Sequence, residues 1–133
     1  MLVPRLPTVG EYRYLLACVG WPVPPAEAAQ LSLDVAVGGA CALADGQIVG
    51  MGRLMSDGAY HCALVDLVVH PDRQRRGLGS ALLQHLEGVA AATQRSSVLT
   101  MTAAPEHVGF YERAGYVNTG SLLLRKAVRP PET

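Results

Sequence analysis

The spacing of apolar positions changes several times along the chain, and these changes predict the order of helices and strands. Apolar residues follow a helical spacing in residues 9–19, and Pro25 suits the first turn of a second short helix that runs to residue 33. Three segments rich in small and β-favouring residues come next: 34–44, 47–55 and 59–69. The strong turn signals between them are Asp45-Gly46 and Asp57-Gly58. We therefore predict two N-terminal helices followed by an antiparallel meander of three strands.

A second change of pattern follows the third strand and predicts a crossover connection. Residues 77–92 carry an apolar face at helical spacing, and residues 97–102 return to strand character. A strand–helix–strand unit of this length places its second strand parallel to the first. Residues 105–114 predict a short helix that ends at Gly115, and residues 116–127 predict a last strand or hairpin. The predicted fold class is thus α/β with a mixed sheet, in which an antiparallel meander precedes a parallel β-α-β crossover and helices cover both faces.

Composition narrows the class of protein without identifying it. The 133 residues fit a single domain, residues 1–133, and half of them are apolar, which excludes an intrinsically disordered chain. Eleven basic residues balance eleven acidic ones, so the net charge does not favour nucleic-acid binding. Three cysteines without C-x-x-C spacing predict neither a disulfide framework nor a metal site. No stretch resembles a signal peptide or reaches the length of a membrane span, so we expect a cytoplasmic protein.

The stretch that joins the third strand to the following helix carries the strongest chemical signal. It runs from His70 to Ser80, includes Gly77 and Gly79, and holds three arginines, namely Arg73, Arg75 and Arg76. Glycines let the backbone approach a ligand closely, and the first amides of a helix have no intrahelical partner and lie at the positive end of its dipole. Arginine adds a rigid fork of donors that suits phosphate. We therefore predict a phosphate site at this turn.

Two common phosphate motifs do not fit this stretch. A P-loop would need a lysine, and none is present there; a dinucleotide fingerprint would need a third glycine where Leu82 stands. A helix start that binds nothing would leave three arginines in four positions unexplained. The predicted site is therefore a phosphate loop of another kind.

Three motifs follow one another along the chain. They are Leu67-Val68-Val69-His70-Pro71, the signature Gln74-x-x-Gly77-x-Gly79, and Phe110-Tyr111-Glu112-Arg113-Ala114-Gly115-Tyr116. With them the chain resembles the GNAT superfamily of acetyl-CoA-dependent N-acetyltransferases, whose V-x-P, Q/R-x-x-G-x-G/A and F-Y-x-x-x-G-F/Y elements they match in order. The resemblance covers most of the chain and implies the GNAT fold and an acyltransferase; the N-terminal helices match only in outline.

The resemblance also implies roles for individual residues. The amides from Arg75 to Ser80 would hold the pyrophosphate of acetyl-CoA, and the strand end would pair with its pantetheine arm. The Val69 amide would polarise the thioester carbonyl and stabilise the oxyanion, and Tyr111 would protonate the departing thiolate as general acid. The residues implied to bind acetyl-CoA are Leu67, Val68, Val69, Arg73, Gln74, Arg75, Arg76, Gly77, Leu78, Gly79 and Ser80.

The chain departs from the family pattern at several positions. Ala104 stands where many relatives carry an asparagine, and His107, expected to face solvent, where they carry an alanine. Ala63 stands where some relatives place a glutamate as general base. The remaining candidates for a base, each equally able to play a structural role, are Asp57, His61 and Asp66. A water relay, or an amine that arrives neutral, would need no dedicated base.

The acceptor is less well specified than the donor. In the family it binds between the N-terminal helices, the sheet and the C-terminal hairpin, and the residues this implies here are Tyr12, Tyr14, Trp21, Asp57 and His61. They suit the primary amine of a small molecule or a peptide, attacking directly in a ternary complex. No metal is implied, and a homodimer is an option because relatives are often dimers. The alternatives are a non-catalytic acyl-CoA-binding module or sensor, and more remotely a nucleotide-binding regulator.

Overall fold

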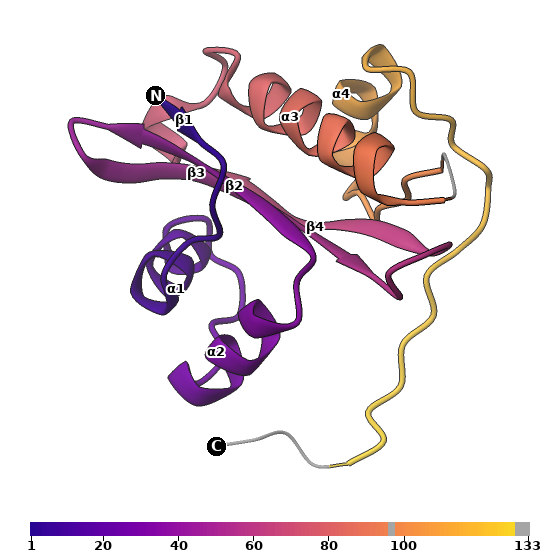
Figure 1. Cartoon of the computed structure of the whole chain (residues 1–133), viewed down its shortest axis with the longest axis horizontal. Coiled ribbons are helices and arrows are strands. Elements are labelled where there is room, and N and C mark those ends of the chain that lie inside the picture. Colours follow the sequence, from indigo (N-terminus) through magenta and orange to yellow (C-terminus); the bar gives the residue numbers. More distant parts are fainter. Residues whose placement is uncertain (96–97, 130–133) are drawn as a thin grey trace. The chain divides into compact units, whose positions relative to one another are not determined.

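The structure is a computed structural model that describes residues 1–95 and 98–129. The chain divides into two compact units, Met1–Thr100 and Met101–Thr133, and each is described by itself. The first contains the sheet and three helices, and the second contains one short helix and an extended segment (Figure 1). The expectation of a single domain stays a prediction.

The sheet of the first unit has four strands that pair antiparallel in chain order. They are β1 (Leu2–Val3), β2 (Gly38–Ala44), β3 (Gln47–Ser56) and β4 (Cys62–Val69). Asp45 and Gly46 both have positive φ, 51° and 77°, as a two-residue hairpin turn requires. The meander and the first turn are confirmed. The second turn is longer than predicted because Asp57 Oδ1 accepts hydrogen bonds from three successive amides, so that β4 begins at Cys62 rather than at Ala59.

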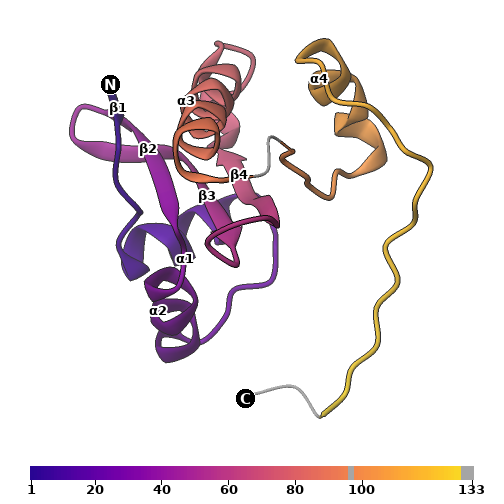
Figure 2. The ribbon, with the colours of Figure 1, turned by 45° about the vertical axis from the view of Figure 1, so that its right-hand side comes forward.

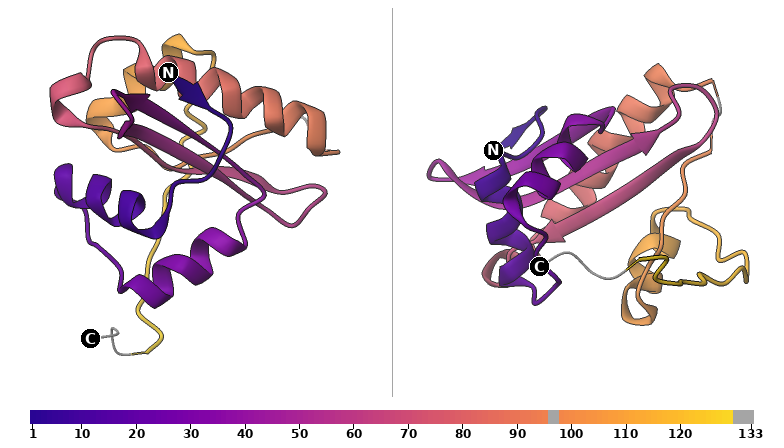
Figure 3. Two further views of the ribbon diagram at one scale, coloured as in Figure 1. Left: turned by 60° about the vertical axis from the view of Figure 1, so that its left-hand side comes forward. Right: turned by 90° about the horizontal axis from the view of Figure 1, so that it is seen from below.

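Helices cover both faces of this sheet, as predicted. The helices α1 (Val9–Cys18) and α2 (Ala26–Asp34) lie on one face, and α3 (Leu78–Thr93) lies on the other (Figures 2 and 3). Glycine in β3 permits the close approach of α3, since a Cβ at Gly52 would lie 2.7 Å from Leu86 Cδ1. The sheet is thus held between two apolar layers, which fixes where α3 begins relative to the end of β4.

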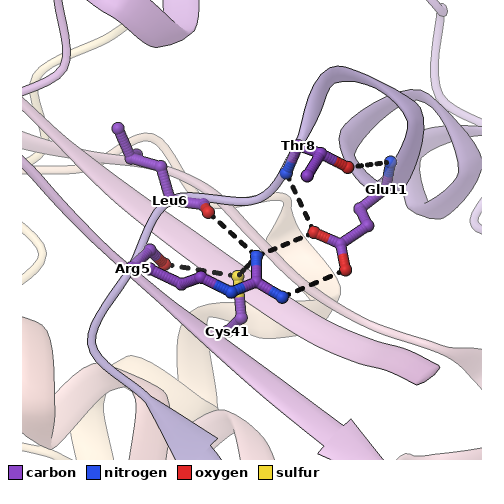
Figure 4. A network of polar contacts seen from close by, with 5 residues as sticks. All are labelled: Arg5, Leu6, Thr8, Glu11 and Cys41. Atoms are coloured by element: carbon purple, nitrogen blue, oxygen red, sulfur yellow. Dashed lines mark hydrogen bonds and ion pairs between the residues drawn. The ribbon is translucent and has the colours of Figure 1, made fainter. Parts of the chain in front are cut away.

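The start of α1 is fixed by a small polar network (Figure 4). Thr8 and Glu11 form a capping box, in which the Thr8 hydroxyl accepts from the Glu11 amide and the Glu11 carboxylate accepts from the Thr8 amide. Both Arg5 terminal nitrogens donate to that carboxylate, at 2.8 and 3.2 Å. The Arg5 guanidinium lowers the pKa of Glu11. The network anchors α1 on β2 through contacts between Arg5 and Cys41.

Leu86 offers a direct test of the layer between α3 and the sheet. Its side chain is 0% exposed, so we expect Leu86→Ala to lower the free energy of unfolding by about 2–5 kcal/mol through lost burial and a residual cavity. Leu31→Ala on α2 is the matched control, because Leu31 is 63% exposed. Urea denaturation measures both; equal effects from the two substitutions would contradict this packing.

The predicted crossover is present in reduced form. A single parallel bridge joins Ala63 and Thr100, in which the Leu64 amide donates to Thr100 O at 2.8 Å and the Thr100 amide donates to Cys62 O at 3.1 Å. The described residues of 97–102 form no strand beyond this single bridge, and Ser97 lies outside the described residues. The chain at Thr100 therefore runs parallel to β4, but the strand predicted at residues 97–102 is confirmed only at Thr100.

In the second unit the short helix is confirmed and the last strand is not. A 3-10 turn, η2 (Pro105–His107), leads into α4 (Val108–Arg113), and Gly115 has the left-handed φ of 98° expected after a helix. Residues 116–127 form no strand, and Leu122 and Leu124 are 85% and 87% exposed. The prediction of a strand or hairpin there is wrong for this structure, because β-favouring residues form a strand only when a neighbouring strand pairs with them.

Candidate active site

The turn between β4 and α3 has the backbone of an anion site. Arg75 and Gly77 both have positive φ, 63° and 83°. Gly77 is the N-cap of α3, no side chain caps the helix, and a Cβ at Gly77 would meet no atom within 4 Å. The first amides of α3 therefore face an open surface at the positive end of the helix dipole.

Three arginines surround this helix start. Arg75 and Arg76 are exposed and Arg73 is half-buried. No guanidinium among them forms an ion pair with a carboxylate in residues 1–95 or 98–129. They are available to an anionic ligand without first breaking an internal pair. The predicted phosphate site thus combines open amides with uncommitted positive charge.

The backbone amide of Val69 points to the outer edge of β4. The next residue, His70, donates its N–H to Val49 O on β3 at 2.8 Å. Consecutive residues of an antiparallel strand direct their amides to opposite sides, so the Val69 N–H is directed away from β3. The Val69 carbonyl faces the same way, and it accepts a hydrogen bond from Gln74 Nε2 at 2.9 Å. Gln74 thereby connects the turn between β4 and α3 to the end of β4.

An irregularity in β4 sets this direction. Arg53 pairs with Val65 and Met51 with Val68, so three steps on β4 match two on β3. Asp66 lies in the extra step with a left-handed φ of 56°. Before the irregularity, the Leu64 amide points to the outer edge, toward Thr100. A regular strand would then direct the Val69 amide inward, so the bulge turns it outward.

Two partners hold the Asp66 side chain on the face of the sheet that α1 and α2 cover. Its Oδ2 accepts from the Tyr12 hydroxyl at 2.7 Å and from Arg53 Nε at 2.9 Å. The Arg53 guanidinium lies 5.5 Å from the centre of the Tyr12 ring, and its Nη1 also donates to Ser32 O on α2. Burial is the main cause that raises the pKa of Tyr12 to about 12, and the hydrogen bond to Asp66 adds to it. Tyr12 therefore remains a proton donor to Asp66 at neutral pH.

Sequence reasoning missed this arrangement in part. It offered Asp66 as a candidate base that could equally play a structural role, and it named neither Tyr12 nor Arg53 as a partner. Tyr12 was expected on the acceptor side; its side chain is 5% exposed and is bonded to Asp66. The available signal was a pair of opposite charges, Arg53 and Asp66, within two otherwise apolar strands.

The other residues expected on the acceptor side lie in different places. Trp21 is 42% exposed after the end of α1. Asp57 is the turn former described above, and the His61 ring packs edge-on against the exposed Tyr60. Asp57 and His61 border a hollow at the start of β4. The chain from His61 to Val69 corresponds to about 25 Å of extended strand, so the structure does not bring this hollow together with the Val69 amide.

Tyr111 lies in the second unit on α4. Its ring packs edge-on against Phe110 and Tyr116, with ring centres 5.0 and 5.7 Å away. Burial raises the pKa of Tyr111, which keeps its hydroxyl protonated. His107, at the end of η2, is exposed as expected.

Comparison with known proteins decides the family. A family model described as "Acetyltransferase (GNAT) domain" matches residues 27–129, which include parts of both units. The chain belongs to the GNAT family of acetyltransferases. The predicted membership, fold and enzyme class are confirmed at this level.

Relatives and solved structures agree with the GNAT assignment. An uncharacterized N-acetyltransferase, ycf52, of Pyropia yezoensis is 32% identical over 74 residues, which cover 56% of this chain and 42% of the relative. Serotonin N-acetyltransferase 2 of rice, a chloroplastic protein, is 29% identical over 112 residues, 81% of this chain and 56% of the relative. This GNAT chain thus spans about half or less of the length of these curated relatives.

Among solved structures, a probable acetyltransferase of Staphylococcus aureus has the same fold, with a TM-score of 0.84 at 23% identity, covering 95% of this chain and 98% of that one. An acetyltransferase of Deinococcus radiodurans described as putative has a TM-score of 0.74 at 26% identity, covering 95% and 87%. Over the described residues, no helix has both the length and the apolar character to cross a bilayer, and no group of three or more potential metal ligands is found.

Proposed function

We propose that this GNAT domain transfers the acetyl group of acetyl-CoA to a primary amine of a small molecule or peptide, by direct attack in a ternary complex. The observation that carries the proposal is the outward Val69 amide, which Gln74 links to the uncapped start of α3. This arrangement offers donors for a carbonyl oxygen at one end and for phosphates at the other. A cytoplasmic location and a homodimer remain predictions.

The residues at the turn fit the phosphate end of acetyl-CoA. The amides of residues 75–80 would bind the pyrophosphate, and the nearby arginines would contact the outer phosphates. Leu67, Val68 and Val69 would offer the edge of β4 to the pantetheine arm as to an added strand. When bound, acetyl-CoA supplies the activated acetyl thioester.

Two groups of this chain would then assist acetyl transfer. The Val69 N–H would donate a hydrogen bond to the acetyl carbonyl oxygen, where negative charge develops. The Tyr111 hydroxyl would give its proton to the departing sulfur, and its raised pKa favours the protonated form that this role needs. The amine would lose its own proton to water, since Asp66 is committed to Tyr12 and Arg53.

The acceptor would approach β4 from the side of the N-terminal helices. Tyr14 and His70 form a tilted ring pair with centres 6.1 Å apart next to the Val69 position, and Tyr14 is 48% exposed. This pair would offer an aromatic wall to a small amine, and Trp21, which follows the end of α1, would contact the acceptor from there. Asp57 and His61 would reach only the distant part of a longer acceptor such as a peptide.

The arginines give a prediction that is specific to the donor. We expect Arg75→Gln with Arg76→Gln to raise KM for acetyl-CoA by about 2- to 30-fold while kcat changes little. Both side chains are exposed, and each lost contact between exposed charges contributes roughly 0.2–1 kcal/mol. Arg13→Gln with Arg95→Gln removes the same net charge elsewhere and is the control. If both double variants raise KM equally, overall charge rather than this site attracts the donor.

A screen of diverse amines with acetyl-CoA tests the proposed function itself. Release of free thiol, measured with a chromogenic reagent, should depend on both acetyl-CoA and one class of amine, and the amine should gain one acetyl group by mass spectrometry. Tight acetyl-CoA binding without amine-dependent release would instead support the non-catalytic acyl-CoA-binding module.

A further inference from the structure

We propose that Asp66 is a positioning residue, whose carboxylate holds the bulge in β4 that directs the Val69 amide toward the donor. The proposal rests on the proposed function, because it assigns a role to the same amide. It adds a group of hydrogen-bonded side chains from α1, β3 and β4, which lies on the face of the sheet that α1 covers.

The backbone gives the first reason. Asp66 adopts a left-handed φ of 56° in the middle of a strand, a conformation that is uncommon for residues other than glycine, although asparagine and aspartate adopt it more readily than the rest. In the middle of a strand it interrupts the regular ladder, so contacts that hold the residue there help to maintain it. The register shows what it achieves, because the extra step between Val65 and Val68 reverses the direction of the following amides.

The side chain gives the second reason. Asp66 Oδ2 accepts two hydrogen bonds, from the hydroxyl of Tyr12 on α1 and from the guanidinium of Arg53 on β3. Arg53 is only 8% exposed, and it also donates to Ser32 O and to Met55 Sδ. One carboxylate oxygen is thus held by a rigid, buried group and by a helix packed on the sheet.

These contacts connect the α1 face of the sheet with the outer edge of β4. The Asp66 carboxylate is tied to the helices on one side, and three residues later the Val69 amide points to the open edge. Residues 66 and 69 belong to one short strand, and the bulge at residue 66 sets the direction of the amides that follow it. Loss of the carboxylate contacts would therefore let the bulge move and misdirect the Val69 amide, although the Asp66 carboxylate itself is bonded to Tyr12 and Arg53.

Asp66→Asn and Asp66→Gly test the role from two directions. Asparagine tolerates the left-handed conformation and keeps an acceptor for Tyr12, but removes the charge opposite Arg53. Glycine permits this φ without strain and removes the side chain. The matched control is Glu11→Gln, which weakens another arginine–carboxylate pair of this unit and preserves its capping box.

We expect both Asp66 variants to lower kcat by about 10- to 100-fold, the loss that misplacement by about 1 Å produces, with KM for acetyl-CoA changed less than about twofold. Glu11→Gln should leave kcat unchanged. Assays are corrected for the folded fraction from thermal melts. Wild-type kcat in Asp66→Gly would overturn the proposal, since the φ alone would then suffice, and so would equal changes in kcat and KM.

An amide measurement separates this proposal from the proposed function. In ¹⁵N-labelled protein without substrate, the Val69 resonance should shift and its hydrogen exchange should change in both Asp66 variants but not in Glu11→Gln. A wild-type protein that acetylates no amine would contradict the function and leave this result standing. An unaltered Val69 resonance in the Asp66 variants would overturn the positioning role whatever the activity.

Discussion

Val69→Pro will transfer acetyl groups about 100- to 1,000-fold more slowly than the wild-type protein, the loss expected when one backbone donor to a developing oxyanion is removed. Proline lacks the N–H and changes nothing else in the donor set. The fold should survive, because the Val69 N–H points away from β3 and makes no hydrogen bond in the ladder, a position that an edge strand permits for proline. Steady-state kinetics and a thermal melt measure the two effects.

Val69→Ala is the control for this substitution. It keeps the amide and shortens the side chain, so kcat should remain within about threefold of wild type if the N–H is the active group, as expected for a loss that does not touch the transition state. A Val69→Pro protein that is folded and retains wild-type kcat would show that the amide has no part in acetyl transfer. Equal losses in the two variants would assign the effect to the side chain.

Tyr111→Phe should lower kcat by about 100-fold or more, because general acid catalysis by a positioned side chain contributes about 10²- to 10⁴-fold. Burial raises the Tyr111 pKa above its ordinary value, so the acid form persists through the neutral range and the loss of activity from its ionisation should lie above about pH 10. In Tyr111→Phe this alkaline loss should disappear. Binding of acetyl-CoA, measured by calorimetry, should be unchanged.

Tyr116→Phe provides the comparison within the same aromatic cluster. Tyr116 packs against Tyr111 with ring centres 5.7 Å apart, and removing its hydroxyl leaves the ring in place. We expect near wild-type kcat and an unaltered pH profile. If Tyr111→Phe also leaves amine-dependent thiol release unchanged, Tyr111 is a packing residue and the departing sulfur takes its proton from water.

Local patterns in the sequence predict the parts of this protein that local interactions determine. Asp45-Gly46 forms a two-residue turn because both residues accept positive φ, and Gly115 ends a helix for the same reason. The basic turn at Arg75 and Gly77 is likewise visible in the sequence. These features depend on a few neighbouring residues, so a single sequence is enough to predict them.

Features that depend on pairing between distant segments could not be predicted in the same way. The bulge at Asp66 exists only in the register between β3 and β4, and the apolar run from Leu64 to Val69 does not reveal it. The contact of Tyr12 with Asp66 joins residues 54 positions apart. The segment 116–127 has the composition of a strand but forms none here. The bulge and the Tyr12 contact depend on partners elsewhere in the chain, and segment 116–127 pairs with no strand among the described residues.

An NMR titration of ¹⁵N-labelled protein with acetyl-CoA tests most directly whether one donor site runs from the Val69 amide to the start of α3. The amides of Val69 and of residues 75–80 should show the largest shifts, and NAD at the same concentration should shift them far less. Shifts confined to other parts of the chain, or equal shifts with NAD, would contradict the site described here.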